Sequence, residues 1–423
     1  MTFLDELRAA YDDRSTVALA IEHDLEPIDG AHAPVAPPTY ASEDNSSKEP
    51  VLPVSPDTPL PEPNVDGWLS GVRRDGAGGA VTAPSVVLDS VAAQSGRAEA
   101  ALWELREELG GLPAFVVTSP EDADRYASGV VLSSWQAAHR HVDAWFKYAA
   151  EQSGAGPLWA EESPVQSLLA RINTTSDARE AFAYAPNSMM YGFWLSYGAA
   201  QLHRQPRVYR SEIVGYGAHE HRAGTTKSDP VPASRDSVLS RSAVGLTAKN
   251  TSSKKQADLV KPSELGFGLM PQPVRARQFS CERIAARASV SLSALRRMRY
   301  GSEAGERERR RAGSVALMVL ALAGDVLGRQ DTLLRSGCDL MPVASRWGWR
   351  VAGRSAPVRL ALPEQAVEPE WWGSQLQAAL DSCREYGLEF AEPVQLQLSR
   401  LQQEVIAEAV RRDAAREHTD EGS

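Results

Sequence analysis

The segment from Pro206 to Asp229, PRVYRSEIVGYGAHEHRAGTTKSD, constrains the fold more than any other part of the chain. It begins with β-branched and aromatic residues typical of a strand, Val208, Tyr209, Ile213 and Val214. Glycines at positions 215 and 217 then free the backbone, and cationic and hydroxyl side chains follow. Such groups, placed around unpaired backbone amides, are suited to binding phosphate. An ordinary strand followed by a solvated loop fits the segment equally well.

Charge is distributed unevenly along the 423 residues, whose formal net charge is −10. Residues 1–70 hold 14 acidic and 3 basic side chains, whereas residues 200–311 hold 22 basic and 10 acidic side chains. A polyanion responds to the local balance of acidic and basic side chains rather than to the net charge. The basic region at residues 200–311 is therefore compatible with a nucleic-acid partner, although the protein as a whole is acidic. Solvated helix faces are the alternative explanation for these arginines, above all for the run from Glu306 to Arg311.

The cysteines, Cys281, Cys338 and Cys383, lie far apart and show no metal-ligand spacing, so we expect neither a disulfide framework nor a zinc site. This usage fits a reducing cytoplasm. Residues 1–15 are acidic and amphipathic, unlike a signal peptide. The longest apolar run, residues 312–324, is too short to span a bilayer and predicts a buried helix. We therefore expect no membrane association.

Composition divides the chain into four regions. Residues 1–30 form an N-terminal segment, with a helix expected to about Glu22, and residues 31–80 form a flexible insertion rich in proline and acidic side chains. Residues 81–360 form the core, which contains a mobile loop at about 228–263. Residues 361–423 form a helical extension.

Helical periodicity recurs at several places in this core and extension. A short strand from Ser85 should lead into a helix with Asp89 as a plausible N-cap, and residues 132–148 should form another helix. A second helical block is expected over residues 280–328, and two amphipathic helices over about 370–417. The last of these helices, LQLSRLQQEVIAEAVRR, is expected to dock on its own domain.

Several motifs occur together in a characteristic order. They are APVAPPTYA, VVLDSVAAQSGRAEAAL, AFAYAPNSMMYGFWLSYG, RVYRSEIVGYG, GFGLMPQPVRA, SLSALRRMRYG and LLRSGCDL. In this order they resemble the CRISPR-associated RAMP-superfamily backbone subunits of the Cas-seven type, specifically the Csb subgroup of type I-G (formerly I-U) Cascade. The resemblance spans about residues 35–340.

That resemblance implies an α+β fold, with an RRM-like (ferredoxin-like) antiparallel sheet as a palm, inserted thumb and finger lobes, and C-terminal helices. It implies a subunit without catalytic activity or cofactor that polymerises along a CRISPR RNA (crRNA) for antiviral defence. The implied partners are crRNA, target DNA, other copies of the chain and other Cascade subunits. A guide bound irrespective of its sequence must be held through phosphates and 2′-hydroxyls rather than base edges.

The resemblance also assigns candidate RNA-binding residues. Gln94, Ser95 and Arg97 match a helix-initiating element that would face the RNA backbone, although the usual asparagine of that element is missing here. Arg210 and Ser211 match the strand entry, preceded by Arg207. The remaining candidates lie in the basic loop and after the GFGLMPQP turn: Arg222, Thr225, Thr226, Lys227, Arg275 and Arg277.

Two rival functions stay open at this point. His219 and His221 flank Glu220, and paired histidines can act as acid and base in RNA cleavage, as in a RAMP endoribonuclease that processes precursor crRNA. No third metal ligand is identifiable, and His139 and His141 would lie on opposed positions of one helix. A scaffold that contacts only proteins is the other alternative, but it leaves the basic middle unexplained.

Overall fold

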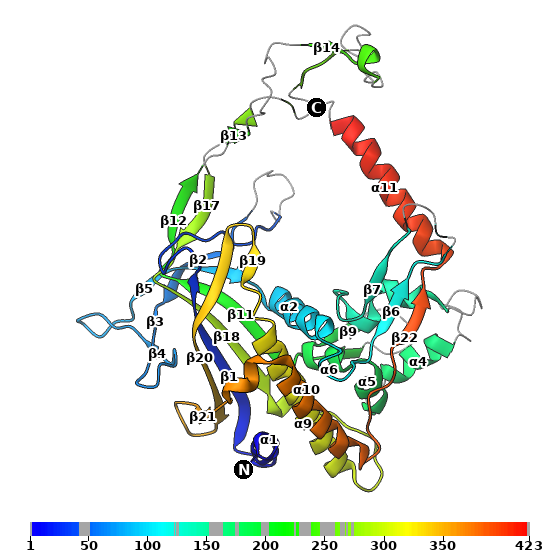
Figure 1. Ribbon diagram of the computed structural model, residues 1–423. Coiled ribbons are helices and arrows are strands. Elements are labelled where there is room, and N and C mark those ends of the chain that lie inside the picture. The colour runs from blue at the N-terminus through cyan, green and yellow to red at the C-terminus, as the bar shows by residue number, and fades with distance from the viewer. Residues whose placement is uncertain are drawn as a thin grey trace.

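A large antiparallel sheet with helices on one face dominates the computed structural model, which also has a second, smaller sheet and a projecting β arm (Figure 1). The structure describes residues 2–41, 51–121, 123, 127–151, 164–173, 177–195, 203–223, 226–227, 238–245, 259–262, 267, 270–271 and 275–420. The expected mixture of helices and strands around an antiparallel sheet is confirmed.

The main sheet has the strand order β19-β20-β1-β18-β11-β5-β2, and β21 pairs with β20. Every neighbouring pair is antiparallel. In chain order the strands are β1 (Thr16–Pro27), β2 (Val54–Pro59), β5 (Thr82–Asp89), β11 (Tyr209–Tyr216), β18 (Arg283–Ser291), β19 (Leu333–Arg335), β20 (Cys338–Val351) and β21 (Val358–Leu360). Strands distant in sequence therefore meet in the centre of the sheet.

Two helices connect these strands across the same face of the sheet. Helix α2 (Val91–Glu104) follows β5 and precedes β11, and helix α9 (Glu306–Leu327) lies between β18 and β20 in the chain. The two helices pack closely, since a Cβ on Gly324 would lie 3.3 Å from the Cβ of Ala98. The N-cap of α2 is Ser90, whose hydroxyl accepts a hydrogen bond from the Ala93 amide, rather than Asp89.

Helix α9 forms the centre of the hydrophobic core. Its residues 312–325 are all buried, so the predicted buried helix is confirmed. Helices α1 (Phe3–Asp12) and α10 (Pro369–Arg384) pack against it. A helix that is apolar on all sides needs partners on all sides, and here the sheet and the surrounding helices supply them.

The second sheet, of order β7-β6-β22-β8, joins distant parts of the chain. Its strands are β6 (Phe115–Thr118), β7 (Val131–Ser133), β8 (Ala150–Glu151) and β22 (Val394–Gln397). Strand β22 pairs in parallel with β6, so the C-terminal region contributes a strand as well as the two predicted helices. Those helices, α10 and α11 (Arg400–Asp420), are confirmed, and Gln402 at the start of α11 donates a hydrogen bond to the Trp145 carbonyl.

The β arm is the chain between β11 and β18. Its hairpin pairs are β12 (His219–Ala223) with β17 (Arg275–Ser280), β13 (Thr226–Lys227) with β16 (Met270–Pro271), and β14 (Leu239–Ser240) with β15 (Leu259–Val260). Figure 1 shows these pairs one beyond the other, projecting away from the main sheet. Gly217, at φ +60°, makes the turn from β11 into the arm, whereas Gly215 lies within β11.

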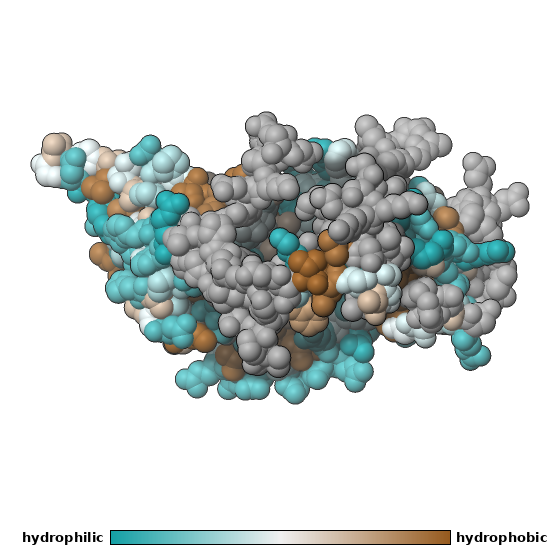
Figure 2. Space-filling model, turned by 90° about the horizontal axis from the view of Figure 1, so that it is seen from above, coloured by the Kyte–Doolittle hydropathy of each residue, from teal (hydrophilic) through white to brown (hydrophobic). Residues whose placement is uncertain are grey.

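The remaining elements are short. They are β3 (Pro61–Glu62), β4 (Gly71–Val72), η1 (Arg140–Val142), α3 (Ala144–Lys147), α4 (Pro164–Ile172), α5 (Arg179–Tyr184), α6 (Pro186–Tyr191), β9 (Phe193–Leu195), β10 (His203–Gln205), η2 (Ser242–Val244), α8 (Leu292–Leu295) and η4 (Glu364–Val367). Among the described residues no helix is long and apolar enough to cross a membrane. Viewed from above, the coloured surface is mainly hydrophilic, with hydrophobic residues in small separate groups (Figure 2).

Three expectations for local structure are wrong. The first helix ends at Asp12, and Thr16–Pro27 is a strand paired on both sides by β18 and β20. Residues 132–148 form a strand end, η1 and α3 rather than one helix. The block 280–328 begins with strand β18. In the first and third cases pairing with distant strands outweighs the local helical pattern.

The insertion at residues 31–80 contains more structure than its composition indicates. Strand β2 pairs with β5 at the edge of the main sheet. Leu60, Trp68 and Leu69 are buried, and Trp68 and Leu69 belong to a loop that lies over the sheet. Residues 42–50 of this segment lie outside the described residues.

Candidate nucleic-acid interface

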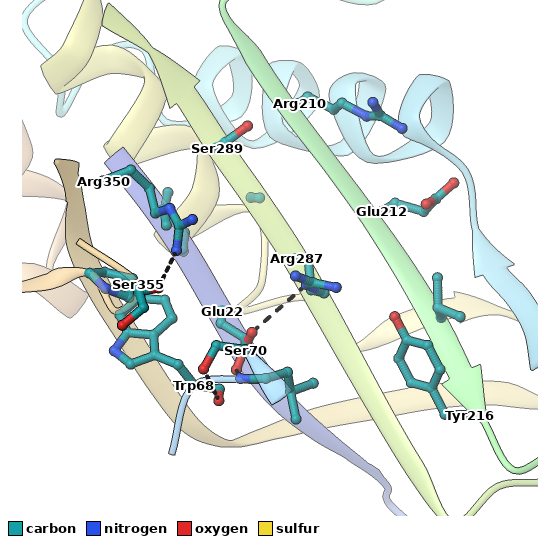
Figure 3. Close-up of a pocket in the computed structure, with 16 residues that line it drawn as sticks. Glu22, Trp68, Ser70, Arg210, Glu212, Tyr216, Arg287, Ser289, Arg350 and Ser355 are labelled. Atoms are coloured by element: carbon teal, nitrogen blue, oxygen red, sulfur yellow. Dashed lines mark hydrogen bonds and ion pairs between the residues drawn. The ribbon is translucent and has the colours of Figure 1, made fainter. Parts of the chain in front are cut away.

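Side chains along β11 alternate between the two faces of the main sheet. Tyr209 and Ser211 point to the helices, where they contact Asp325 of α9 and Gln94 of α2. Arg210 and Glu212 point to the opposite face, which we call the open face (Figure 3). Adjacent residues of one strand therefore have opposite environments.

The open face carries a hollow of about 570 Å³. Strands β1, β18 and β11 form its floor, and the loop at Trp68–Ser70 together with Ser355 and Pro357 forms part of its wall. Figure 3 shows Arg350, Arg287 and Arg210 coming from three different strands toward this hollow. The hollow is thus a broad concave surface that has cations spread across it.

A row of alternating charge crosses the open face. Strand register places Arg346 opposite Glu22, Glu22 opposite Arg287, and Arg287 opposite Glu212. Glu22 accepts a hydrogen bond of 2.9 Å from the Leu69 amide, and burial raises the pKa of this carboxyl above its usual value. The Glu22 carboxylate lies 3.8 Å from both Arg287 and Arg346, so it holds neither guanidinium tightly.

The next row of the open face is made of small side chains. Ala20 of β1 pairs with Ser289 of β18, which in turn pairs with Arg210 of β11. Small residues leave the sheet backbone accessible to a ligand. At the β20 end of this row, Gly348 is covered by Trp68 and Pro357, which close the hollow on that side.

Within the described ranges, two arginines of the open face have no acidic partner. Arg350 donates one hydrogen bond of 3.1 Å to the Ser355 carbonyl, and Arg210 makes no ion pair or side-chain hydrogen bond within the described part of the chain. Both side chains are exposed. Guanidinium groups with free donors are the groups that bind phosphate oxygens best.

The helix-covered face holds four of the predicted RNA-binding residues. Gln94, Ser95 and Ser211 are buried, and Gln94 bridges the Ser211 hydroxyl to Asp89. Arg97 donates to Asp89 at 3.0 Å and to the carbonyl oxygens of residues 333 and 334. In this structure Gln94, Arg97 and Ser211 join α2 to the sheet, whereas the Ser95 hydroxyl donates to the Val91 carbonyl within α2.

Asp325 lies at the centre of this buried network. It accepts hydrogen bonds from Tyr209 at 2.7 Å and from Arg329 at 3.0 Å, and His23 Nε2 lies 2.8 Å from its second oxygen. The pKa of Asp325 is lowered, because these partners outweigh the opposing effect of burial. Burial lowers the pKa of His23, so a neutral imidazole donates to Asp325 here and accepts from the Ser345 hydroxyl.

The predicted basic loop is part of the β arm. Arg222 of β12 is exposed and lies 3.6 Å from Glu220, and register places Ala223 opposite Arg275 on β17. Arg277 lies on the same strand, Thr226 and Lys227 form β13, and Thr225 lies outside the described residues. Strand β11 separates Arg210 from these residues by about 20 Å at 3.3 Å per residue. The sheet and the arm therefore carry two distinct groups of cations.

Among the described residues, the four histidines named in the sequence analysis do not come together in a catalytic arrangement. His221 Nε2 lies 2.9 Å from the Ser280 hydroxyl, and His219 is two residues away on the same exposed strand. His141 is buried and lies 2.6 Å from the Ser188 hydroxyl, whereas His139 is exposed at the start of η1. Among the described residues no group of histidine, cysteine and carboxylate side chains has the geometry of a metal site.

Three further residues of the open face were not identified from the sequence, although local signals for them exist. Arg287 and Ser289 lie in a segment expected to be helical, and their i, i+2 spacing in ARASVS is the signal that they share one strand face. Arg350 lies in RWGWRV, where tryptophans alternate with polar residues in the same way. Their common surface arises only when β20, β1, β18 and β11 pair.

Residues 19–220 match the family model described as CRISPR-associated protein GSU0053. The match supports a CRISPR-associated protein. It covers most of β1 and all of β5, α2 and β11, but it ends before β18 and β20. No curated protein matches the chain.

Proposed function

We propose that the chain is a crRNA-binding backbone subunit of the Cas-seven type, in a type I-G Cascade complex, without catalytic activity of its own. The family match supports the CRISPR association. The open face carries the proposal further, because Arg210 and Arg350, which have no acidic partner in the described part of the chain, line a hollow on a wide sheet. Target DNA, other copies of the chain and other Cascade subunits complete the proposed partners.

The order of elements supports an RRM-like palm. The strands β20, β1, β18 and β11 are neighbours, and β1, α2, β11, β18, α9 and β20 follow one another in the chain. This is a β-α-β-β-α-β arrangement with both helices on one face, and it leaves the other face for a ligand. The arm between β11 and β18 corresponds in the proposal to a thumb.

The chemistry of the open face favours backbone recognition over base reading. Arg210, Arg287 and Arg350 offer charged hydrogen-bond donors. The small side chains of the row through Ala20 and Ser289 leave the sheet backbone accessible between them. Such a surface binds phosphates and hydroxyls irrespective of sequence, as a guide-binding subunit requires.

Salt dependence tests the proposed mode of binding. Fluorescence anisotropy across a salt series, on two guides of unrelated sequence, should give a steep loss of affinity with salt and similar affinities at each salt concentration. A flat salt response, or affinities that differ widely between the guides, would contradict binding through phosphates.

Co-purifying RNA tests the proposed partner. The protein isolated from its host should carry RNA of uniform length with repeat-derived ends, and assemblies rebuilt on longer guides should be larger. RNA of random origin would sink the guide-binding role, and assemblies of fixed size would exclude polymerisation along the guide.

A further inference from the structure

A second hollow, of about 560 Å³, lies next to the N-terminal end of β11, and we call it the basic hollow. The hairpin β9–β10, helices α5 and α6, and the residues that follow β18 form its walls. Four arginines line it, namely Arg204, Arg207, Arg297 and Arg299. They come from two separate parts of the chain, so local sequence does not reveal the cluster.

No acidic side chain is among the described residues that line the basic hollow. Arg297 and Arg299 are exposed, and neither forms an ion pair or side-chain hydrogen bond within the described ranges. Partial burial and the neighbouring guanidinium groups of Arg140 and Arg210 lower the pKa of Arg207. The Glu99 carboxylate opposes this lowering only in part, so the like charges still repel each other, and a bound anion would relieve that repulsion.

The floor of the basic hollow is apolar. Met189, Phe193 and Met298 line it and are largely buried. A hollow with an apolar floor and a cationic rim fits a ligand that has a flat apolar part and an anionic part. Inorganic phosphate alone would leave the floor uncovered, whereas a nucleotide supplies both parts.

The neighbouring aromatic side chain favours the same ligand class. Trp194 is 58% exposed, and the guanidinium carbon of Arg204 lies 5.0 Å from the centre of its ring. Stacked indole and guanidinium planes are common partners of nucleobases. Gly192, at φ +78°, allows the chain to turn here, and a Cβ at this position would crowd Arg207.

We propose that the basic hollow binds one nucleotide, with its base over the apolar floor and its phosphate at Arg207, Arg297 and Arg299. The nucleotide is either free or one unit of a single strand. The second source is consistent with the position of β18, which carries Ser289 in the open-face hollow and Ser291 in the basic hollow. The inference does not depend on RNA binding at the open face, because none of the described residues that line the open-face hollow also lines the basic hollow.

Isothermal titration with AMP and pyrophosphate, together with anisotropy of a labelled eight-nucleotide RNA, tests the assignment. In the double variant Arg297→Gln with Arg299→Gln, affinity for AMP, for the oligonucleotide or for both should fall roughly tenfold to hundredfold. Loss with AMP identifies a site for free nucleotides, and loss with the oligonucleotide alone identifies a site for a strand unit. Unchanged binding of both probes would overturn the proposal.

Three controls separate this site from other causes. Arg311→Gln with Arg384→Gln removes the same charge from helices α9 and α10 and should leave binding of both probes unchanged. Arg210→Gln with Arg350→Gln should spare AMP binding even if it abolishes guide binding, so the two proposals can fail separately. Photocrosslinking of a 4-thiouridine oligonucleotide should label Phe193 or Met298, and pyrophosphate that binds as tightly as AMP would exclude the role of the floor.

Discussion

Two arginines of the open face differ from the arginines of the helix-covered face in whether they are paired with an acid. On the helix-covered face, Arg329 donates to Asp325 and Arg97 donates to Asp89, each at 3.0 Å. On the open face, Arg210 has no acidic partner among the described residues, and Arg350 contacts only a carbonyl. Burial forces a charge to be paired, whereas exposure allows it to stay available.

This contrast separates structural from ligand-binding cations on the same strands. Ser211 and Arg210 are neighbours in sequence, yet one joins the sheet to α2 and the other faces solvent. Variants on the two faces should therefore affect different measurements, namely stability on one face and RNA affinity on the other.

The largest expected effect is a loss of stability caused by a change on the helix-covered face. Asp325→Ala should lower the free energy of unfolding by about 3–5 kcal/mol, because it leaves the buried Arg329 charge, Tyr209 and His23 without their shared partner. Urea denaturation measures the loss. Asp381→Ala is a suitable control, since Asp381 is exposed on α10, and it should change stability by less than about 0.5 kcal/mol. Equal stability of the two variants would contradict the assigned role of Asp325.

The next effect is on RNA affinity. Arg210→Gln with Arg350→Gln should weaken guide binding roughly tenfold to hundredfold at low salt, because two unpaired guanidinium groups are lost. Thermal melting should be unchanged, since neither side chain is buried. Arg311→Gln with Arg384→Gln changes the net charge equally and should bind normally. A folded double variant that still binds RNA tightly would remove the open face from the interface.

A smaller effect concerns pH and His23. Burial lowers the pKa of His23 in the folded protein. As pH falls through about 6.5, His23 is protonated in the unfolded chain but not in the folded chain. The free energy of unfolding therefore decreases as pH falls. Between pH 7 and 5.5 the stability should fall because of His23.

The contribution of His23 to the pH dependence of stability must be measured as a difference between variants, because another buried group titrates in the same range. Burial raises the pKa of Glu99 to about 7 although Arg140 is its partner, so Glu99 contributes stability below its unfolded pKa that fades as pH rises toward 7. This trend is opposite to that of His23. Urea unfolding of His23→Gln should lack the decrease in the free energy of unfolding that His23 causes as pH falls. His32→Gln, at an exposed position, should show the same decrease as the unchanged protein. Identical pH profiles for all three proteins would refute a neutral buried His23.

The smallest effect should come from an acid on the open face. Glu212→Gln removes the negative charge opposite Arg287 and should strengthen RNA binding about two- to threefold. The gain should disappear at high salt, because screening weakens the repulsion between Glu212 and phosphates. Weaker binding by this variant would mean that Glu212 positions Arg287 rather than repels RNA.

Local pattern was sufficient for some parts of the fold. The apolar run at 312–324 predicted a buried helix, the two C-terminal helices followed from their periodicity, and Val208 to Val214 marked a strand. The order of motifs indicated a CRISPR-associated protein, which the family match supports. These features depend on residues close together in sequence or on resemblance along the chain.

Other parts depend on partners that the sequence does not display. Thr16–Pro27 mixes helical and alternating patterns, and only β18 and β20 on either side make it a strand. Gln94 and Arg97 have the chemistry of RNA-binding residues, but α2 lies against the sheet and Asp89 takes their donors. The chemical type of a side chain is local information, whereas the face on which it lies is set by tertiary pairing.

The parallel pair β6–β22 has a consequence for how the protein is made. Residues 115–118 leave the ribosome long before residues 394–397, so the nascent chain carries an incomplete sheet edge through most of its synthesis. An unpaired edge is a template for pairing with other chains. Truncation before residue 394 should therefore give an aggregating protein rather than a shorter folded one, because β6 then lacks its partner β22.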